Sequence, residues 1–107
     1  MDWTVEFLSE AIERELDSLP KEFRARFERI VQLINADGLH QVHEPYIKHL
    51  EGPLWEMRLQ GRDGIARAVY VTVKVRRVVV VHVFVKKSQK TPRRDIEIAL
   101  KRAKEVL

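Results

Sequence analysis

The sequence predicts an α+β fold in which an N-terminal strand and a helical hairpin pack on a mostly antiparallel β-sheet that is followed by a C-terminal helix. Three observations predict it. Apolar residues recur at helical spacing in the first third of the chain, follow strand patterns between residues 54 and 86, and return to helical spacing near the end. The chain has 107 residues, close to the commonest domain size, so we expect residues 1–107 to form a single domain.

The N-terminal segment predicts a short strand and then a short helix. Apolar and polar residues alternate in Asp2–Phe7, which is typical of a strand with one buried face. Ser9 is a favourable N-cap, because its hydroxyl accepts a hydrogen bond from a backbone N–H of the first turn. We therefore expect a helix from Glu10 to about Ser18.

A second helix follows directly and completes the hairpin. Pro20 suits its first position, where no backbone N–H is needed. Apolar residues then form a helical stripe between Phe23 and Ile34, and Gly38 is the expected left-handed residue after the last turn. Residues 39–53 have a mixed composition with two prolines and a glycine, so we expect a connecting loop there.

Three strands are predicted in the second half, separated by short turns. The first is LWEMRLQ, residues 54–60, in which large apolar residues alternate with polar ones. After the turn GRDG, the β-branched and aromatic segment IARAVYVTVKV, residues 65–75, is the second. The third is VVVVHVFVK, residues 78–86, which follows the turn RR. It is almost continuously apolar, and we expect it to be buried on both faces in the middle of the sheet.

A basic segment joins the last strand to the final helix. Thr91 and Pro92 suit the N-cap and the first turn of that helix, whose apolar stripe runs from Ile96 to Val106. The twelve residues FVKKSQKTPRRD contain five Lys or Arg, more than a solubilising strand end needs. We therefore interpret this segment as part of a site that meets an anion.

Composition and charge restrict the function further. The chain has no cysteine, which excludes disulfides, thiolate catalysis and cysteine-ligated metal sites. It has neither an apolar stretch of membrane-spanning length nor a signal-peptide pattern, so we expect a cytoplasmic protein without membrane contact. Residues 1–45 carry a net charge of −5 and residues 46–107 a net charge of +9, an asymmetry that predicts binding of nucleic acid or another polyanion.

Three segments of the second half carry a combined signature. They are KHLEGPLWEMRLQG, IARAVYV and VHVFVKKSQKTPRRDIEIALKRAKE, over about residues 46–105. Together they resemble the phage-associated branch of the RelE/HigB-type toxins of bacterial toxin–antitoxin systems, with its signature LWE-x-R, R-x-x-Y and F-x-KK-x-x-K-x-P. The resemblance implies a RelE-like fold and an endoribonuclease that cleaves messenger RNA, usually in the ribosomal A site. It also implies a cognate antitoxin, commonly a helix-turn-helix protein, and contact with operator DNA only through that antitoxin.

By this resemblance, Arg58, Arg67, Lys86 and Lys90 lie at catalytic positions. RNA cleavage without a metal can use the neighbouring 2′-hydroxyl as the nucleophile, so we expect neither a metal nor a cofactor. Arg58 and Arg67 suit a bidentate grip on phosphate. They are expected to lie close together across the hairpin, with Arg67 on a sheet face outside the core. Lys86 or Lys90 is the candidate for proton transfer, because clustered positive charge lowers a lysine pKa.

The roles of the other charged residues are predicted as RNA binding, as solvent exposure or as ion pairing. Lys87, Arg93 and Arg94 are the predicted RNA-binding residues. Arg93, Arg94 and Arg102 also suit the solvated face of the final helix. Glu56 is interpreted as a base or, more simply, as an ion-pair partner of the neighbouring cations.

Two other functions fit the same sequence. A ParE-type toxin shares the fold and inhibits DNA gyrase without cleaving RNA, and an inactive relative would bind RNA only. Many RelE/HigB-type toxins keep a Tyr or His near the C-terminus, whereas nothing after Phe84 is aromatic here and His82 is expected to be a hydrogen-bonded histidine of the sheet. The general base is therefore unassigned, and the basic set on the sheet favours the nuclease.

Overall fold

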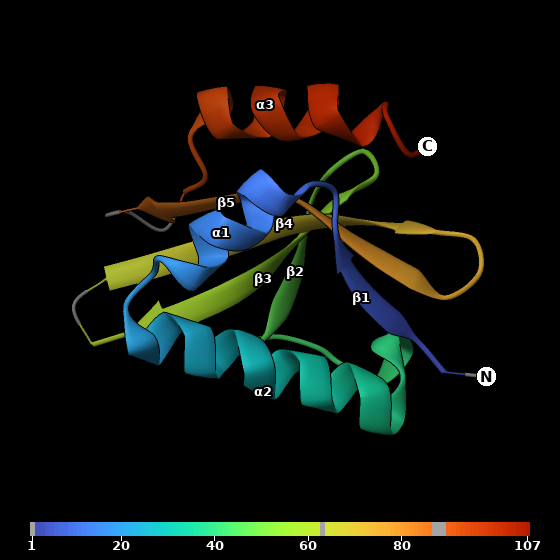
Figure 1. Cartoon of the computed structure of the whole chain (residues 1–107), viewed down its shortest axis with the longest axis horizontal. Helices are drawn as coiled ribbons and strands as arrows, with labels where there is room; N and C mark the ends of the chain where they lie inside the picture. Colours follow the sequence, from blue (N-terminus) through green and yellow to red (C-terminus); the bar gives the residue numbers. More distant parts are fainter. Residues whose placement is uncertain (1, 63, 87–89) are drawn as a thin grey trace.

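The structure is a computed structural model that describes residues 2–62, 64–86 and 90–107. Its elements follow the predicted order, with one more strand and a short 3-10 helix between the hairpin and the sheet (Figure 1). They are β1 (Thr4–Phe7), α1 (Glu10–Asp17), α2 (Lys21–Asp37), η1 (Leu39–Gln41), β2 (Ile47–Glu51), β3 (Leu54–Gly61), β4 (Gly64–Val73), β5 (Arg77–Lys86) and α3 (Arg93–Ala103).

The strands form one mixed, five-stranded sheet in the order β1–β5–β4–β3–β2. Neighbouring strands run antiparallel except β1, which pairs in parallel with β5. The predicted α+β class and the mostly antiparallel sheet are therefore confirmed. The predicted position of the valine-rich strand is wrong by one place, because β4 is the middle strand and β5 lies between β4 and β1. β5 is nevertheless buried on both faces from Val78 to Val83.

β2 lies in the segment that the sequence predicts to be a loop. It has five residues and forms an edge of the sheet, where Ile47, Lys48 and His49 pair with β3. A short edge strand leaves one side open to solvent, so its sequence lacks the apolar run of an interior strand. This explains why residues 39–53 have a mixed composition although they contain regular structure.

Helices cover both faces of the sheet (Figure 1). α1 and α2 pack on one face, where Phe27 and Ile30 of α2 join Tyr70 of β4 in the larger core. α3 crosses the other face, where Ala99 and Ala103 pack on a smaller core of leucine and valine side chains. The smaller core occupies only part of that face, and charged side chains occupy the part next to it.

Capping explains several helix ends. The Ser9 hydroxyl accepts a hydrogen bond from the backbone N–H of Ile12 at 3.3 Å, as predicted. Gly38 closes α2 with a φ of 84°, a conformation that favours glycine. The prediction that Thr91 caps the final helix is wrong. α3 begins after Pro92, and the Thr91 hydroxyl makes its hydrogen bonds to Lys86 and Glu56 instead.

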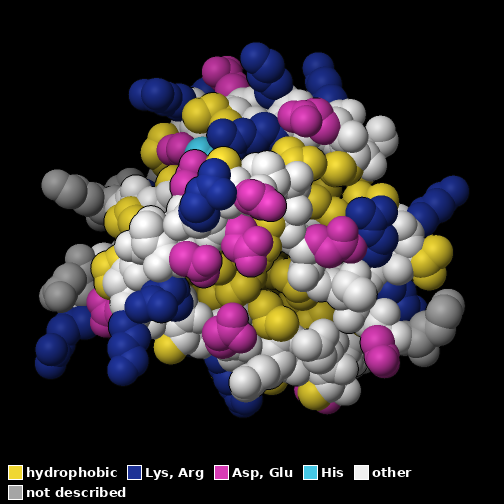
Figure 2. Space-filling model, viewed as in Figure 1, with side chains coloured by type: hydrophobic (Ala, Val, Ile, Leu, Met, Phe, Trp, Pro, Cys, Tyr) yellow, Lys and Arg dark blue, Asp and Glu magenta, His cyan; other side chains and the backbone are white. Residues whose placement is uncertain are grey.

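The surface reflects the uneven distribution of charge along the chain. On the face shown in Figure 2, acidic side chains gather across the middle, over α1 and α2 and around an apolar area, while most Lys and Arg side chains stand at the margin. Of the net charge of −5 that residues 1–45 carry, α1 contributes −3 and α2 contributes +1. Within the described residues, no helix combines the length and the apolar composition that crossing a membrane requires.

Candidate active site

Two arginines face each other on the side of the sheet that α3 covers. β3 and β4 pair so that Arg58 lies directly opposite Arg67. Side chains alternate between the two faces along a strand, so Glu56 and Arg58 project to the same side as Arg67. The register confirms the prediction that the hairpin brings the two arginines together.

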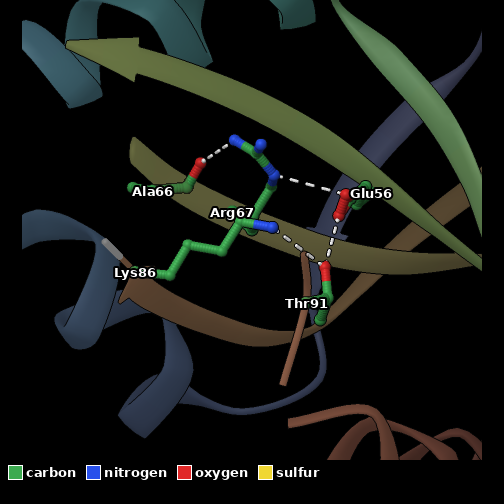
Figure 3. A network of polar contacts seen from close by, with 5 residues as sticks. All are labelled: Glu56, Ala66, Arg67, Lys86 and Thr91. Carbon is green, nitrogen blue, oxygen red and sulfur yellow. Dashed lines mark hydrogen bonds and ion pairs between the residues drawn. The ribbon is translucent and has the colours of Figure 1, made fainter. Parts of the chain in front are cut away.

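Arg67 is a core residue. Its side chain is fully buried in the middle strand, so the prediction that it lies outside the core is wrong. Its Nε lies 3.2 Å from Oε2 of Glu56, and its Nη1 donates to the carbonyl of Ala66 at 3.1 Å (Figure 3). Burial lowers the pKa of the Arg67 guanidinium, and the Glu56 carboxylate opposes this shift. Because an arginine stays protonated in proteins, β4 carries a buried positive charge.

Lys86, Thr91 and Glu56 extend this network to β5 (Figure 3). The Lys86 ammonium donates to the Thr91 hydroxyl at 3.2 Å, and that hydroxyl donates to Oε1 of Glu56 at 3.0 Å. Lys86 is only 5% exposed. Burial lowers the pKa of Lys86, and the charge of Arg67 lowers it further. Such a lysine gives up a proton more readily than a solvated lysine does, which suits proton transfer.

Several cations of the described part of the chain gather around Glu56. Arg67 lies beside it, Lys86 reaches it through Thr91, and Arg58 lies opposite Arg67. Lys48 of β2 adds another cation, because it pairs with Glu56 across the strands. The charge of Lys48 also lowers the pKa of Lys86. Like charges held together cost free energy, and a bound phosphate would offset that cost. The cluster therefore has the electrostatic character of an anion site.

The remaining predicted residues surround this cluster unevenly. Lys90 is exposed and directly precedes Thr91, whereas Lys87 lies outside the described residues. Arg93 forms ion pairs with Glu51 at 2.7 Å and Glu97 at 3.4 Å, so it joins the start of α3 to the end of β2. Arg94 is exposed on the first turn of α3.

His82 is a hydrogen-bonded histidine of the sheet, as predicted. Its Nε2 lies 2.8 Å from Oδ1 of Asp95, and its ring stacks on Phe84 with centroids 5.2 Å apart. Arg102 donates to Nδ1 of His82 at 3.1 Å and to the carbonyl of Val81 at 3.0 Å. The interpretation of Arg102 as a purely solvated residue is therefore wrong, because it holds α3 against β5.

Two members of the cluster were not predicted as site residues. Thr91 has the sequence signature of a helix cap, and a buried hydroxyl between two charged groups leaves no separate signal in the sequence. Lys48 lies in the segment interpreted as a loop, so its strand pairing with Glu56 was not expected. The strand pattern IKHLE, read as a short edge strand, would have placed Lys48 beside β3.

The fold and this cluster describe an α+β protein with a cationic candidate site under its last helix. The chain belongs to the family described as phage-derived protein Gp49-like, whose model matches residues 14–104 and which is a RelE/HigB-type toxin family. No curated protein sequence shows significant similarity to the chain.

A solved structure supports the same fold. The chain is similar to a chain in the crystal structure of the archaeal RelE–RelB complex from Pyrococcus horikoshii OT3, with 21% sequence identity and a TM-score of 0.56. The match covers 84% of this chain and 100% of the archaeal chain. At this identity the likeness concerns the fold, which confirms the predicted RelE-like architecture.

Proposed function

We propose that the protein is the toxin component of a type II toxin–antitoxin system and that it cleaves messenger RNA on the ribosome. The family and the fold support the toxin. The nuclease is supported by one observation above others, the buried cation cluster in which Lys86 has a lowered pKa beside Arg58 and Arg67. Binding to gyrase would not require such a cluster. Keeping like charges together lowers the stability of the fold, and a gyrase-binding surface elsewhere on the molecule would gain nothing from it.

In the proposed reaction, the 2′-oxygen of a nucleotide attacks the adjacent phosphorus and the bond to the 5′-oxygen of the next nucleotide breaks. The products are a 2′,3′-cyclic phosphate and a free 5′-hydroxyl. Arg58 holds the phosphate and stabilises the charge that builds up on its oxygens, which is commonly the largest catalytic effect. The Lys86 ammonium donates the proton that the departing 5′-oxygen needs.

Arg67 acts through its neighbours in this proposal. It is fully buried and pairs with Glu56, so it orients that carboxylate, while its charge lowers the pKa of Lys86. Lys90 is the second proton-transfer candidate, and Lys87, Arg93 and Arg94 contact the RNA backbone. The proton of the attacking 2′-hydroxyl passes to solvent water.

The partners follow from the same proposal. Because the archaeal neighbour was solved as a RelE–RelB complex, we infer that this chain also binds an antitoxin, a helix-turn-helix protein that carries the pair to operator DNA. Because the proposed substrate is messenger RNA on the ribosome, the protein would act in the cytoplasm. It would act as a single domain and would need neither a metal nor an organic cofactor.

The test is a reconstituted translation reaction with a defined message and purified protein. We expect cleavage within the translated region only when ribosomes are present, with a cyclic phosphate on the upstream fragment. Intact message together with trapped DNA gyrase complexes in expressing cells would instead support the ParE-type alternative.

A further inference from the structure

A pocket lies on the face of the sheet opposite the candidate active site, at the β2 edge. Its volume is about 710 Å³, and it is bounded by β2, by the ends of β3 and β4, and by the segment that follows α2. The residues that give it its chemistry are Trp3, Glu44, Lys48, His49, Trp55 and Tyr70. None of them belongs to the predicted catalytic or RNA-binding sets.

The walls of this pocket are aromatic. Trp55 of β3 lies directly opposite Tyr70 of β4, and the ring of His49 meets Trp55 edge-on with centroids 5.0 Å apart. Trp55 is 38% exposed, which makes it one of the few large apolar side chains that the fold leaves open to solvent. Rings on the walls and an open mouth suit a flat aromatic ligand that stacks on a side chain.

The floor of the pocket offers a hydrogen-bonding group without a partner. Tyr70 is 1% exposed, and its hydroxyl makes no hydrogen bond with any of the described residues. A buried polar group left in this state costs stability, so such groups in proteins generally have a partner. Among the described residues the Tyr70 hydroxyl therefore stays unpaired, and a ligand whose polar edge reaches it would supply a partner.

Lys48 connects this pocket to the candidate active site. It lines the pocket, and it pairs across the strands with Glu56 of the cation cluster. β2 is an edge strand, so a chain molecule can pass over it from one face of the sheet to the other. Lys48 stands where the backbone of such a molecule would cross, and its charge favours phosphate.

We propose that the pocket binds one unstacked nucleobase of an RNA strand that crosses β2 on its way to the candidate active site. The base stacks on Trp55, its polar edge meets the Tyr70 hydroxyl, and Glu44 accepts from a base amino group or a ribose hydroxyl. An apolar side chain of a protein partner would fill the same space but would leave the Tyr70 hydroxyl unpaired. The inference rests on the proposed function in so far as the strand is the substrate.

The intrinsic fluorescence of the protein reports on this pocket, because Trp3 and Trp55 are its two tryptophans and both line it. Titration of the full chain with a single-stranded RNA hexanucleotide at low salt is expected to quench that fluorescence. Affinity is measured in parallel from the anisotropy of the same RNA carrying a fluorescent label. Trp55→Leu is expected to weaken binding by about 5-fold to 150-fold, the range of one base stacked on an aromatic ring.

Tyr70→Phe separates recognition from folding. It removes only the hydroxyl, so the melting temperature is expected to stay the same or rise, while RNA affinity falls by about 2-fold to 10-fold through one lost hydrogen bond. Val85→Ala removes an exposed apolar side chain outside the pocket and is expected to leave affinity unchanged.

The proposal is overturned if RNA leaves the tryptophan fluorescence unchanged, or if Trp55→Leu and Tyr70→Phe bind RNA as the wild type does. Weakened binding of the antitoxin by these variants, with RNA affinity intact, would assign the pocket to a protein partner. The proposed nuclease fails separately, if wild-type protein binds RNA in this pocket but does not cleave messages on ribosomes.

Discussion

At the residue scale, Glu56 holds the cation cluster together. One of its oxygens lies beside the buried Arg67 guanidinium, and the other accepts from Thr91, which in turn accepts from Lys86. Without this carboxylate, the buried Arg67 guanidinium would lose the ion pair that lies at 3.2 Å. A buried pair of this kind adds little net stability, but losing one member is costly, because the remaining charge stays buried.

Glu56→Gln is therefore expected to lower the free energy of unfolding by about 3–5 kcal/mol. Urea denaturation followed by circular dichroism measures it. The matched control is Glu97→Gln, which breaks the exposed pair with Arg93 and is expected to leave the free energy of unfolding nearly unchanged, because solvent screens that pair. Equal losses in the two variants would contradict the view that Glu56 compensates a buried charge.

The burial of Arg67 changes how its variants must be interpreted. Arg67→Ala removes a buried charge and core volume together, so loss of toxicity in that variant would reflect folding as well as chemistry. Arg58 and Lys86 are more informative, since Arg58 is partly exposed and Lys86 lies at the end of β5.

The lowered pKa of Lys86 predicts the pH dependence of cleavage. The proposed reaction needs the ammonium form, and burial makes that form lose its proton at a lower pH than a solvated lysine does. Cleavage is therefore expected to fall as the pH rises through the lowered pKa of Lys86, before ordinary lysines titrate. A single-turnover pH–rate profile measures this, and a rate that is flat up to the ordinary lysine range would exclude Lys86 as the acid.

At the scale of elements, α3 is fastened to the sheet by polar contacts as well as by its small apolar face. Asp95 and Arg102, two turns apart on the helix, both bind the ring of His82 on β5. Arg93 adds a link from the helix start to Glu51 at the end of β2. The helix and the Thr91 segment before it therefore have a fixed position over the cation cluster.

Asp95→Ala removes a partly buried hydrogen-bond partner of His82. It is expected to lower the free energy of local opening of α3 by about 1–3 kcal/mol. Hydrogen exchange measures the result: amides of α3 should exchange faster, while those of α2 keep their protection. Lys101→Ala, at an exposed position on the same helix, serves as the control. Unchanged protection of α3 in Asp95→Ala would mean that apolar contacts alone hold the helix.

At the scale of the whole molecule, the sequence predicted most of the fold because its patterns are local. The valine run of β5, the stripe of α2 and the cap of α1 each depend on neighbours along the chain. β2 was missed because an edge strand of five residues lacks such a pattern. The place of β5 was wrong by one because the parallel pairing with β1 joins distant segments.

The candidate site was predicted in part for the same reason. The pairing of Arg58 with Arg67 follows from one hairpin, so it was predictable. The burial of Arg67, the contacts of Thr91 and the nearness of Lys48 depend on how α3, β2 and β5 come together in three dimensions. Lys87 lies outside the described residues, and its predicted role remains a prediction.

In the proposed function, the cluster beneath α3 performs RNA cleavage. The most direct measurement compares single-turnover cleavage of a ribosome-bound message by wild-type protein, Arg58→Gln, Lys86→Gln and Lys74→Gln. Lys74 is an exposed lysine in the turn between β4 and β5, at the other end of these strands from Lys86. We expect rates lowered by about 10²-fold or more for the first two variants and an unchanged rate for Lys74→Gln. Equal rates in all four folded proteins would contradict the proposed function.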